Sequence, residues 1–576
     1  MSSYLFICSI GPVQGFIAAA RSSRDLAYGS WLLSELAKRA ARIIAQQEGF
    51  DALIFPAPQS EKDLERDSDL SVANKVVAEV RGDPIKLAKV VEDSLRQFIK
   101  DAWTPIAKEL GQSVGNDLAV RQLEDLLEFY WVAAPLSSAD KYKDVRNYCE
   151  AALSARKATR NFNLYQGVPR FKSSIDGWRE HVLAEIPDRA SRPNAQQMKL
   201  YKLRNGELLS GVDLLKRWSG IKLPASYRST GYMAALPFAE GLDKDRPGTA
   251  KELCDRLETL IRNEGGNLFV SGDYSVFFPS EVRAAFNDKS KVNLVLQKHE
   301  EILKAYAGDK RPAPYYALLQ ADGDFMGKTI DGQKTPEAHR ELSQALSEFA
   351  KAVPKIIAGH NGVTVYAGGD DILAYLPLHT ALACVGELAE TFKQAMRDFT
   401  FEEGGEAKSP TISAGLVIVH HLEPLSDVLA LARRTEKVAK GVPGKNALAI
   451  ALNKRSGAER TIKQKLPALI GRLQTMTQWW LDGTLSKGAA YELERLAREM
   501  GEVLDEEALR AEAIRILKRK RESGGGQEVR KEVIEKMEKW LKEQKLPLSE
   551  LAQEMIIANE FARAKAQAQG KEREAV

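Results

Sequence analysis

Four aspartates lie at two strand ends of one expected sheet, where their type and spacing could bind a metal ion. Asp322 and Asp324 follow the apolar run 315–321, while Asp370 and Asp371 end the tetrapeptide Gly368-Gly-Asp-Asp371 between two further apolar runs. Carboxylates placed so close repel one another unless a divalent cation lies between them. Such oxygen ligands suit Mg²⁺ or Mn²⁺, which can activate a hydroxyl and steady a triphosphate leaving group. The alternative is a bare hairpin turn, because Gly and Asp are favoured in turns.

Three other residues of this region could contact a nucleotide. Gly368 and Gly369 have no Cβ, so the backbone can turn tightly and come close to a bulky ligand. Lys440 follows an expected helix and could neutralise a triphosphate, although a lysine is also favoured at a helix C-terminus for its interaction with the helix dipole. The segment from Gly323 to Thr329 is one residue too short between its glycines for a phosphate-binding P-loop.

The pattern of apolar runs from residue 314 to 452 predicts how these residues are positioned. Strands and helices are expected in the order β-α-β-β-α-β, followed by one more helix and strand. In such a sheet the first and third strands are central neighbours, so the two acidic pairs should meet at one edge. The expected strands are 315–321, 363–367, 372–376, 411–420 and 447–452, and the expected helices are 337–357, 380–399 and 425–440.

The rest of the chain predicts an α+β protein of four parts. Apolar runs at 4–10, 53–55 and 129–133 alternate with helical patterns and indicate an α+β or α/β unit over residues 1–150. Residues 151–310 are expected to form a mixed α/β connecting domain with short strands at 268–270 and 274–278. The sheet predicted from the apolar runs between 314 and 452 belongs to a domain over 311–456. Helical spacing predicts a helical domain over 457–576.

Composition excludes several classes of protein. The chain has 576 residues, 44% of them hydrophobic, and a formal net charge of +4, too small for nucleic-acid binding through bulk charge. Its four cysteines form no CxxC pair, which argues against a disulfide framework or a zinc site made only of cysteines. No apolar run reaches the ~18 residues of a membrane span. We therefore expect a cytoplasmic protein with no membrane contact.

Several ordered motifs resemble those of a known family, the large polymerase/cyclase-like subunits of type III-B (Cmr) CRISPR effector complexes. The N-terminal motifs are Ile10-Gly-Pro-Val-Gln14, Ala20-Arg21, Arg24-Asp25-Leu26 and Gly29-Ser30. The motifs of the later sheet are Pro314-Tyr-Tyr-Ala317, Asp322-Gly-Asp-Phe-Met-Gly327, Gly368-Gly-Asp-Asp371, Ser413-Ala-Gly415 and Ala439-Lys440.

The resemblance implies two ferredoxin-like palm domains, a domain between them and a terminal helical bundle. It implies a subunit that works with other subunits, CRISPR RNA and target RNA, and whose second palm converts ATP into cyclic oligoadenylate when target RNA pairs. Asp322, Asp370 and Asp371 would hold Mg²⁺ or Mn²⁺. Gly323, Gly368, Gly369 and Lys440 would bind the nucleotide. The first palm has no matching acidic turn and would not catalyse.

Two departures from the family pattern change what we expect. The chain begins at the first palm and its first histidine is His181, so an HD nuclease activity is not expected. In the connecting domain Ser173, Ser210 and Asp213 stand where relatives often carry zinc-binding cysteines, so zinc is not expected. The alternatives to a cyclic oligoadenylate synthase are a non-catalytic scaffold of the same complex and a synthase that joins AMP to another acceptor. A diguanylate-cyclase-like protein working alone fits the N-terminal motifs and the helical tail poorly.

Overall fold

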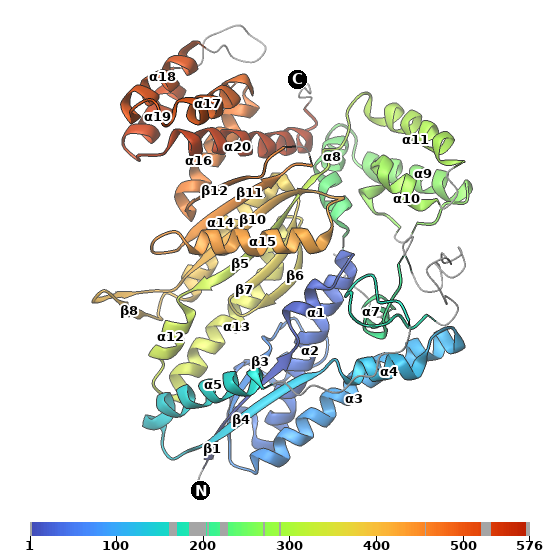
Figure 1. Cartoon of the computed structure of the whole chain (residues 1–576), viewed down its shortest axis with the longest axis vertical. Helices are drawn as coiled ribbons and strands as arrows, with labels where there is room; N and C mark the ends of the chain where they lie inside the picture. The colour runs from blue at the N-terminus through green and yellow to red at the C-terminus, as the bar shows by residue number, and fades with distance from the viewer. Residues whose placement is uncertain are drawn as a thin grey trace.

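The computed structural model describes residues 3–159, 170–183, 203, 207–218, 228–268, 271–286, 290–455, 457–485, 487–519 and 531–571. Figure 1 shows two β-sheets at different heights of an elongated molecule, with strand β1 near the lower end and helix α20 near the upper end. Both expected α+β units are therefore present, and the fold class predicted from the sequence is confirmed.

The first sheet is antiparallel, with the strand order β2-β3-β1-β4. Strands and helices alternate along the chain as β1-α2-β2-β3-α3-β4, which is the ferredoxin-like arrangement. The sequence patterns predicted β1, β2 and β4 but missed β3. The strands are β1 (Ser3–Gly11), β2 (Leu53–Phe55), β3 (Lys75–Val80) and β4 (Glu128–Leu136), and the helices are α1 (Gln14–Ala18), α2 (Ser23–Glu48), α3 (Pro84–Leu110), α4 (Asn116–Glu124) and α5 (Tyr142–Ala158).

Helices cover both faces of the first sheet, so its central strand β1 is buried on both sides. Phe6 and Cys8 of β1 belong to the apolar core that α2 and α3 complete, and the Phe6 ring stacks on Trp131 of β4 at 5.7 Å. On the other face Leu5 and Ile7 pack in a smaller core with α5. The near-continuous apolar run of β1 follows from this two-sided burial.

The second sheet has the order β12-β11-β10-β5-β7-β6. Its part β10-β5-β7-β6 repeats the strand order of the first sheet, and the predicted contact between the first and third strands is confirmed by the β5·β7 pairing. Strand β11 runs parallel to β10, and β12, which the sequence patterns missed, extends the edge. The strands are β5 (Tyr315–Asp324), β6 (Val363–Gly368), β7 (Asp371–Leu376), β10 (Thr411–His420), β11 (Ala447–Asn453) and β12 (Arg460–Lys465), and a small hairpin is formed by β8 (Phe401–Glu403) and β9 (Glu406–Lys408).

The side chains of β5 alternate between the two faces of the second sheet. Ala317, Leu319 and Ala321 face the core formed with α13 (Pro336–Gly359) and α14 (Leu378–Ala395). Residues of even number, Asp322 among them, face the opposite side, where α15 (Leu425–Lys440) lies. Helix α12 (Met326–Gly332) joins the end of β5 to α13. The site residues on β5 therefore lie on the α15 face.

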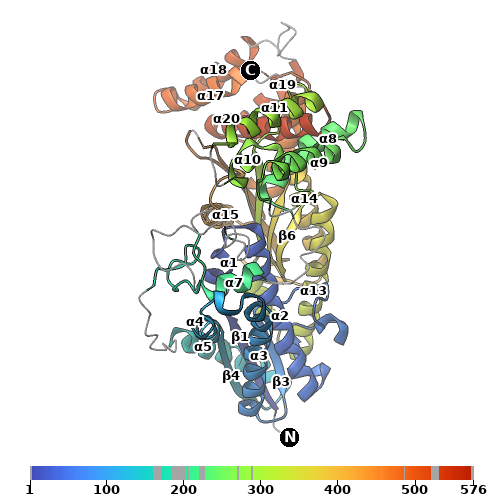
Figure 2. The same cartoon turned by 90° about the vertical axis from the view of Figure 1, so that its right-hand side faces the viewer.

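The first unit contacts the second through α2, α5 and the segment 51–63. Figure 2 shows α2 beside β6. The Arg340 side chain of α13 donates hydrogen bonds to the carbonyls of Asp51 (2.8 Å) and Leu53 (2.9 Å), and Lys351 pairs with Asp63 at 3.1 Å. The two sheets are thus joined by polar contacts as well as by apolar packing.

The described part of the connecting region is largely helical. The predicted strand at 274–278 is wrong: residues Tyr274–Phe277 form a short 3-10 helix, whose first turn is capped by the Asp273 carboxylate. The other predicted strand, 268–270, lies mostly outside the described residues. The extended pairing described for residues 151–310 consists of the bridges Lys172↔Glu180 and Val114↔Leu183. The helices are α7 (Gly211–Trp218), α8 (Thr230–Asp245), α9 (Thr249–Asn263), α10 (Pro279–Ala285) and α11 (Val292–Ala307).

The C-terminal part is helical, as the sequence predicted. Its central helix, α20, packs against α16, and the two are tied by a buried ion pair in which Arg472 contacts Glu554 at 2.6 Å. Among the described helices, none combines the length and the low charge that crossing a lipid bilayer requires. The helices are α16 (Leu466–Leu481), α17 (Lys487–Met500), α18 (Glu506–Arg519), α19 (Lys531–Lys542) and α20 (Leu548–Ala568).

Candidate active site

The acidic hairpin between β6 and β7 has the tightest loop that a hairpin can use. Gly368 pairs with Asp371, so the loop itself is the dipeptide Gly369-Asp370. Gly369 has φ = 72°, a conformation that favours glycine over every other residue. Gly368 lies against Tyr366, because a Cβ on Gly368 would fall 1.8 Å from the Tyr366 hydroxyl oxygen. Gly369 is therefore favoured by its backbone conformation and Gly368 by the Tyr366 side chain, whatever the two glycines do for a ligand.

The strand register brings the two pairs of acids together. Ala321 of β5 pairs with Ile372 of β7, so Asp322 and Asp371 occupy the next position along the same register. Directly opposed residues of antiparallel strands have Cβ atoms about 5 Å apart on the same face. The loop aspartate packs against the other strand end, since a Cβ on Gly323 would fall 2.7 Å from Asp370 Oδ2. The predicted convergence of Asp322, Gly323, Asp370 and Asp371 is thus present in the fold.

Burial and like charge raise the pKa of both hairpin carboxyl groups. Burial raises the pKa of Asp371 to about 7, and the nearby negative charges of Asp370 and Glu436 add to the shift. Burial also raises the pKa of Asp370, although hydrogen bonds from its own backbone and from Gly323 oppose that shift. A site that disfavours two adjacent negative charges in this way would gain from a bound cation.

Lys440 lies at the same strand end and contacts Asp322. Its ammonium group forms ion pairs with Asp322 and, at 3.1 Å, with Glu436 one turn earlier on α15. The helix can lie so close to the sheet because β10 carries Gly415, whose Cβ would be 2.4 Å from the Glu436 backbone nitrogen. In this structure the partners of Lys440 are Asp322 and Glu436, and its predicted approach to a nucleotide's phosphates stays a prediction.

Asp324 is fully buried and holds the strand ends together. Its Oδ2 accepts hydrogen bonds from the hydroxyls of Thr411 (2.8 Å) and Ser413 (2.9 Å) and from the backbone N–H of Asn446 (2.9 Å). These donors fix the end of β10 and the start of β11 against β5. Glu436, Thr411 and Asn446 were not predicted from the sequence. Only the Ser413-Ala-Gly415 motif indicated that this end of the sheet matters.

The acids fit a divalent cation by chemistry but are not arranged around one. Within the described ranges, no group of three or more His, Cys, Asp or Glu side chains is placed to hold a metal ion. Asp322 faces Lys440, while Asp370 packs on Gly323. The donors are all carboxylates, as Mg²⁺ and Mn²⁺ prefer, and Asp324 Oδ1 is buried without a hydrogen-bond partner. Metal binding by Asp322, Asp370 and Asp371 remains a prediction and requires Asp322 to leave Lys440.

A cavity of about 540 Å³ adjoins this site. Thr411 and Asn446, which hold Asp324, form part of its wall, and the stacked rings of Phe325 and Phe401, 4.7 Å apart, form another part. Lys408 and Lys465 also line it, and the ammonium of a further lysine, Lys445, lies 4.3 Å from the Phe325 ring centroid. Lys408 pairs with Glu403, another wall residue, at 3.4 Å, and Lys465 donates to the Lys445 carbonyl at 2.6 Å. The cavity thus combines paired lysines, one carboxylate and an apolar wall beside the acids.

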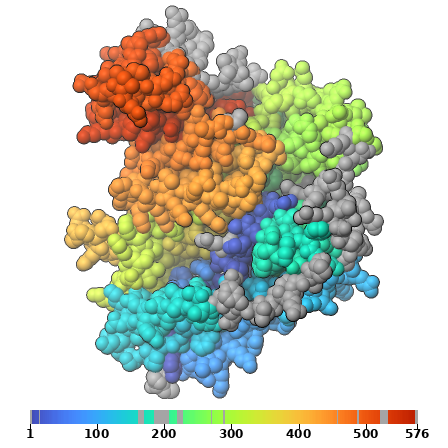
Figure 3. All heavy atoms as spheres, viewed as in Figure 1, coloured from blue at the N-terminus to red at the C-terminus, as the bar shows by residue number. Residues whose placement is uncertain are grey.

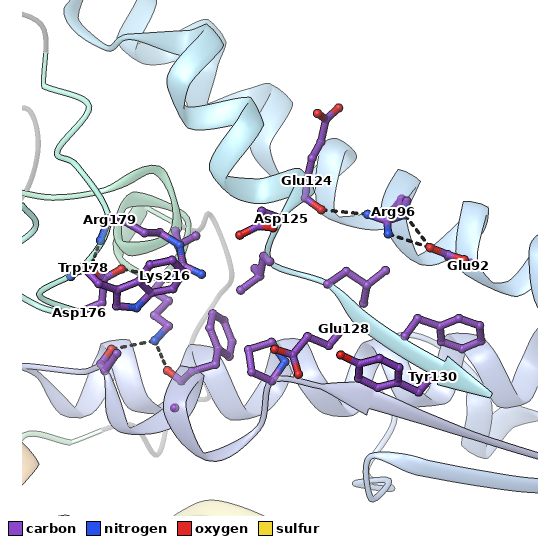
Figure 4. A pocket seen from close by; sticks show the side chains of 18 of the residues that line it. Glu92, Arg96, Glu124, Asp125, Glu128, Tyr130, Asp176, Trp178, Arg179 and Lys216 are labelled. Atoms are coloured by element: carbon purple, nitrogen blue, oxygen red, sulfur yellow. Dashed lines mark hydrogen bonds and ion pairs between the residues drawn. The ribbon is translucent and has the colours of Figure 1, made fainter. Parts of the chain in front are cut away.

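A larger cavity, of about 850 Å³, is lined by residues of the first sheet, of α3 and of the connecting region (Figure 4). Its cations already have partners: Arg96 pairs with Glu92 at 2.7 Å, Arg179 pairs with Asp176 at 3.0 Å, and Lys216 donates to the carbonyl of Ala19 at 2.7 Å. A phosphate group entering this cavity would have to displace these contacts.

The residues that stand in place of zinc ligands form a hydrogen-bonded cluster. The Asp213 carboxylate accepts hydrogen bonds from the Ser173 and Ser210 hydroxyls, both at 2.6 Å, and from the Ser210 backbone N–H at 2.9 Å. All three side chains are buried. Both serine hydroxyls donate to Asp213 Oδ2, whereas Asp213 Oδ1 is buried without a hydrogen-bond partner, and the absence of zinc stays a prediction.

Two families of proteins match separate parts of the chain. Residues 315–449 match the family described as Cas10/Cmr2, second palm domain, and residues 5–108 match CRISPR-associated protein Cmr2, N-terminal. Subunit Cmr2 of the CRISPR system Cmr from Pyrococcus furiosus is 27% identical over 552 residues, covering 78% of this chain and 61% of its own length. The chain thus spans about three-fifths of the length of this curated relative.

Solved structures share the fold over nearly the whole chain. A chain in the cryo-electron microscopy structure of type III-B Cmr-beta in the apo state has a TM-score of 0.63 at 14% identity, covering 92% of this chain and 78% of that one. A chain in the crystal structure of the Csm1–Csm4 cassette in complex with cA4 has a TM-score of 0.50 at 12% identity, covering 98% and 70%. At these identities the similarity concerns the fold.

Proposed function

The chain belongs to the Cas10/Cmr2 family, and on that premise we propose that it is the large subunit of a type III-B CRISPR effector complex whose second palm joins nucleotides derived from ATP. The observation that carries the proposal is the register of β5 and β7, which opposes Asp322 and Asp371 beside Lys440. The product we propose is a cyclic oligoadenylate made when CRISPR RNA in the complex pairs with target RNA. The cassette of similar fold that was solved with cA4 supports this choice of product.

Asp322, Asp370 and Asp371 would hold Mg²⁺ or Mn²⁺ at this site. Bound there, the ion supplies charge neutralisation for the triphosphate and lowers the pKa of the attacking hydroxyl. Gly369 would leave open space for a nucleotide, since a Cβ there would meet no atom within 4 Å, whereas Gly368 lies against the Tyr366 side chain. Asp371, with its pKa raised to about 7, can give up its proton when a cation arrives at neutral pH.

Lys440 would exchange partners when ATP binds. In the free chain it neutralises Asp322 and Glu436. A divalent ion at Asp322 would displace the ammonium, and the triphosphate would give it a new anionic partner. The adjoining cavity of about 540 Å³ is within the size range of small-molecule sites and carries lysines on its wall.

A non-catalytic scaffold is the second candidate, and the Asp322–Lys440 ion pair favours it. With Asp322 engaged, the described acids form no ready cage for a metal ion. In that case the hairpin would be a turn held by its backbone requirements alone, and the subunit would position RNA and partner proteins. A synthase that joins AMP to a different acceptor would use the same site and differ only in product.

The test uses the assembled complex with CRISPR RNA, target RNA, ATP and Mn²⁺, and identifies products by mass spectrometry. We expect a metal-dependent oligoadenylate that disappears with Asp370→Ala/Asp371→Ala while the complex still assembles, because both half-buried carboxyl groups lie at a tight turn and their removal relieves the repulsion between two adjacent acids. Asp427→Asn, which removes one exposed acid on α15, serves as the control for loss of a carboxylate near the site and should keep full yield. Product formation that survives the double substitution would place the chemistry elsewhere, and its absence in the unaltered complex would favour the scaffold.

A further inference from the structure

One helix of the first palm holds the segment that leaves the acid site of the second palm. Tyr142 and Arg146 lie one turn apart on α5 and therefore share a face of that helix. The Tyr142 hydroxyl is hydrogen-bonded to Nδ1 of His339, near the start of α13, at 2.6 Å. In Figure 1 α5 lies directly below α12 and α13, and in Figure 3 its cyan surface meets the yellow-green surface above it. This face of α5 contacts the junction between α12 and α13.

Arg146 caps the C-terminal end of α12. Its Nη1 donates hydrogen bonds to the carbonyls of Ile330 (2.8 Å) and Gln333 (3.2 Å), and its Nη2 lies 3.2 Å from Asp331 Oδ1. The Arg146 side chain is 1% exposed, whereas the Asp331 side chain is 62% exposed. The buried contacts are thus those to the carbonyls, where a cation also meets the negative end of the helix dipole.

The other end of α12 begins at the acid site. Phe325 directly follows Asp324 and has φ = 62°, a left-handed conformation that is uncommon for a bulky residue. The Phe325 carbonyl accepts hydrogen bonds from the Thr329 backbone N–H (3.0 Å) and hydroxyl (3.1 Å), and the Gln333 side chain donates to the Thr329 carbonyl at 2.9 Å. Successive hydrogen bonds therefore connect the carbonyls bound by Arg146 with the residue next to Asp324.

We propose that Arg146 of the first palm is a positioning residue for the second palm's acid site, acting through α12 on the strand end that carries Asp322 and Asp324. This inference rests on the proposed function for its meaning in catalysis. Because Arg146 belongs to the first palm, it makes the geometry of the metal and nucleotide site depend on how the two palms are held together. A change in the first palm or its partners can then alter the activity of the second palm without touching a ligand.

The test compares Arg146→Lys with Asp331→Asn in the assembled complex. Lysine keeps the charge but replaces a planar fork of donors with one ammonium, so it cannot satisfy both carbonyls in the same geometry. Asp331→Asn removes only the exposed ion pair and is the matched control. For Arg146→Lys we expect the Mn²⁺ concentration that gives half-maximal product formation to rise about tenfold, the effect of losing one charge-assisted hydrogen bond. Amide hydrogen exchange of residues 326–333 should become faster, and Asp331→Asn should change neither quantity.

A role limited to holding the palms together would give a different result. Arg146→Lys would then lower the melting temperature and leave both the Mn²⁺ requirement and the exchange of 326–333 unchanged, which would overturn the inference. Asp322→Asn is measured in parallel: if it is inactive while Arg146→Lys behaves as the unaltered complex, this inference alone fails. If the unaltered complex makes no product, the proposed function fails, and the exchange of 326–333 decides whether Arg146 fixes this segment.

Discussion

Lys440, the last residue of α15, forms an ion pair with Asp322 at the end of β5. The ammonium lies where a divalent cation would be needed if Asp322 were a metal ligand. The Asp322 side chain is 33% exposed and that of Lys440 is 25% exposed, so neither is locked in the core. In this arrangement a lysine pairs with the acid in the free chain, and the proposed metal site would need this partner to be exchanged.

The raised pKa of Asp371 predicts a pH dependence of stability. Between the ordinary value of 3.8 and about 7, the folded chain keeps a proton that the unfolded chain has released. The stabilisation is therefore fully present below about pH 4 and is lost as the pH rises through about 7, with a slope of up to ~1.4 kcal/mol per pH unit. We expect Asp371→Asn to remove this slope and to make the metal-free protein more stable at neutral pH.

Denaturant unfolding of the metal-free subunit at pH 5, 6, 7 and 8 measures this effect as the difference between Asp371→Asn and the unaltered chain. Taking the difference cancels the titration of groups common to both. Asp427→Asn, exposed on α15, controls for the change of charge. A difference that stays constant across this range would show that Asp371 has an ordinary pKa.

Gly323→Ala should disturb the acid site directly. The new Cβ would lie 2.6 Å from Met326 Cγ, 2.7 Å from Asp370 Oδ2 and 2.8 Å from Asp370 Cβ, so both the Met326 side chain and the loop aspartate must shift. Overpacking of this kind destabilises by ~1–3 kcal/mol when the surroundings cannot shift, and by less where a loop can. We therefore expect product formation to fall at least tenfold, while the melting temperature falls only slightly.

Gly327→Ala is the matched control for this substitution. Gly327 lies four residues further along, on α12, and a Cβ there would meet no atom within 4 Å. Alanine is also the better helix former, so this variant should be as stable as the unaltered chain or slightly more stable. Equal activities of the two variants in the product assay would remove Asp370 from the site.

The backbone arrangement of the acid site could be predicted from the sequence because it depends on local patterns. Apolar runs defined β5, β6 and β7, and a Gly-Gly-Asp-Asp sequence between two of them fixed the hairpin. The order β-α-β-β-α-β then implied that β5 and β7 are neighbours, which is the contact that brings Asp322 opposite Asp371. Strand β3 was missed because no residue pattern marked where the polar loop 56–69 ends and the strand begins.

The side-chain partners of the site could not be predicted in the same way. Lys440 and Asp322 are 118 positions apart, and their contact depends on how closely α15 lies on β10 at Gly415. Asp324 was grouped with the other acids, yet it binds Thr411, Ser413 and Asn446 in the interior. Arg146 attracted no attention as one arginine on an amphipathic helix. Each of these roles arises from contacts between distant segments, which periodicity does not encode.

Asp322→Asn should change ATP binding in two opposite ways. In the free chain the Lys440 ammonium forms an ion pair with Asp322. When that carboxylate is lost, the ammonium becomes available to a triphosphate. We expect ATP to bind more tightly to Asp322→Asn than to the unaltered chain when no divalent ion is present. With Mn²⁺ the order should reverse, because the variant lacks one of the proposed metal ligands and gains little from the ion, whereas the unaltered chain should gain about tenfold, or ~1.4 kcal/mol.

Isothermal titration calorimetry of the subunit with ATP, with and without Mn²⁺, measures both effects, and the stoichiometry is fitted because the first palm could bind a second nucleotide. Lys440→Met separates the two contributions. The double variant Asp322→Asn/Lys440→Met should not show the tighter metal-free binding of ATP that is expected of Asp322→Asn alone. Lys437→Met, an exposed lysine one turn earlier on α15, is its control. If Mn²⁺ raises ATP affinity equally in the unaltered chain and in Asp322→Asn, then Asp322 is no metal ligand, and its ion pair with Lys440 is the structural contact that the scaffold candidate requires.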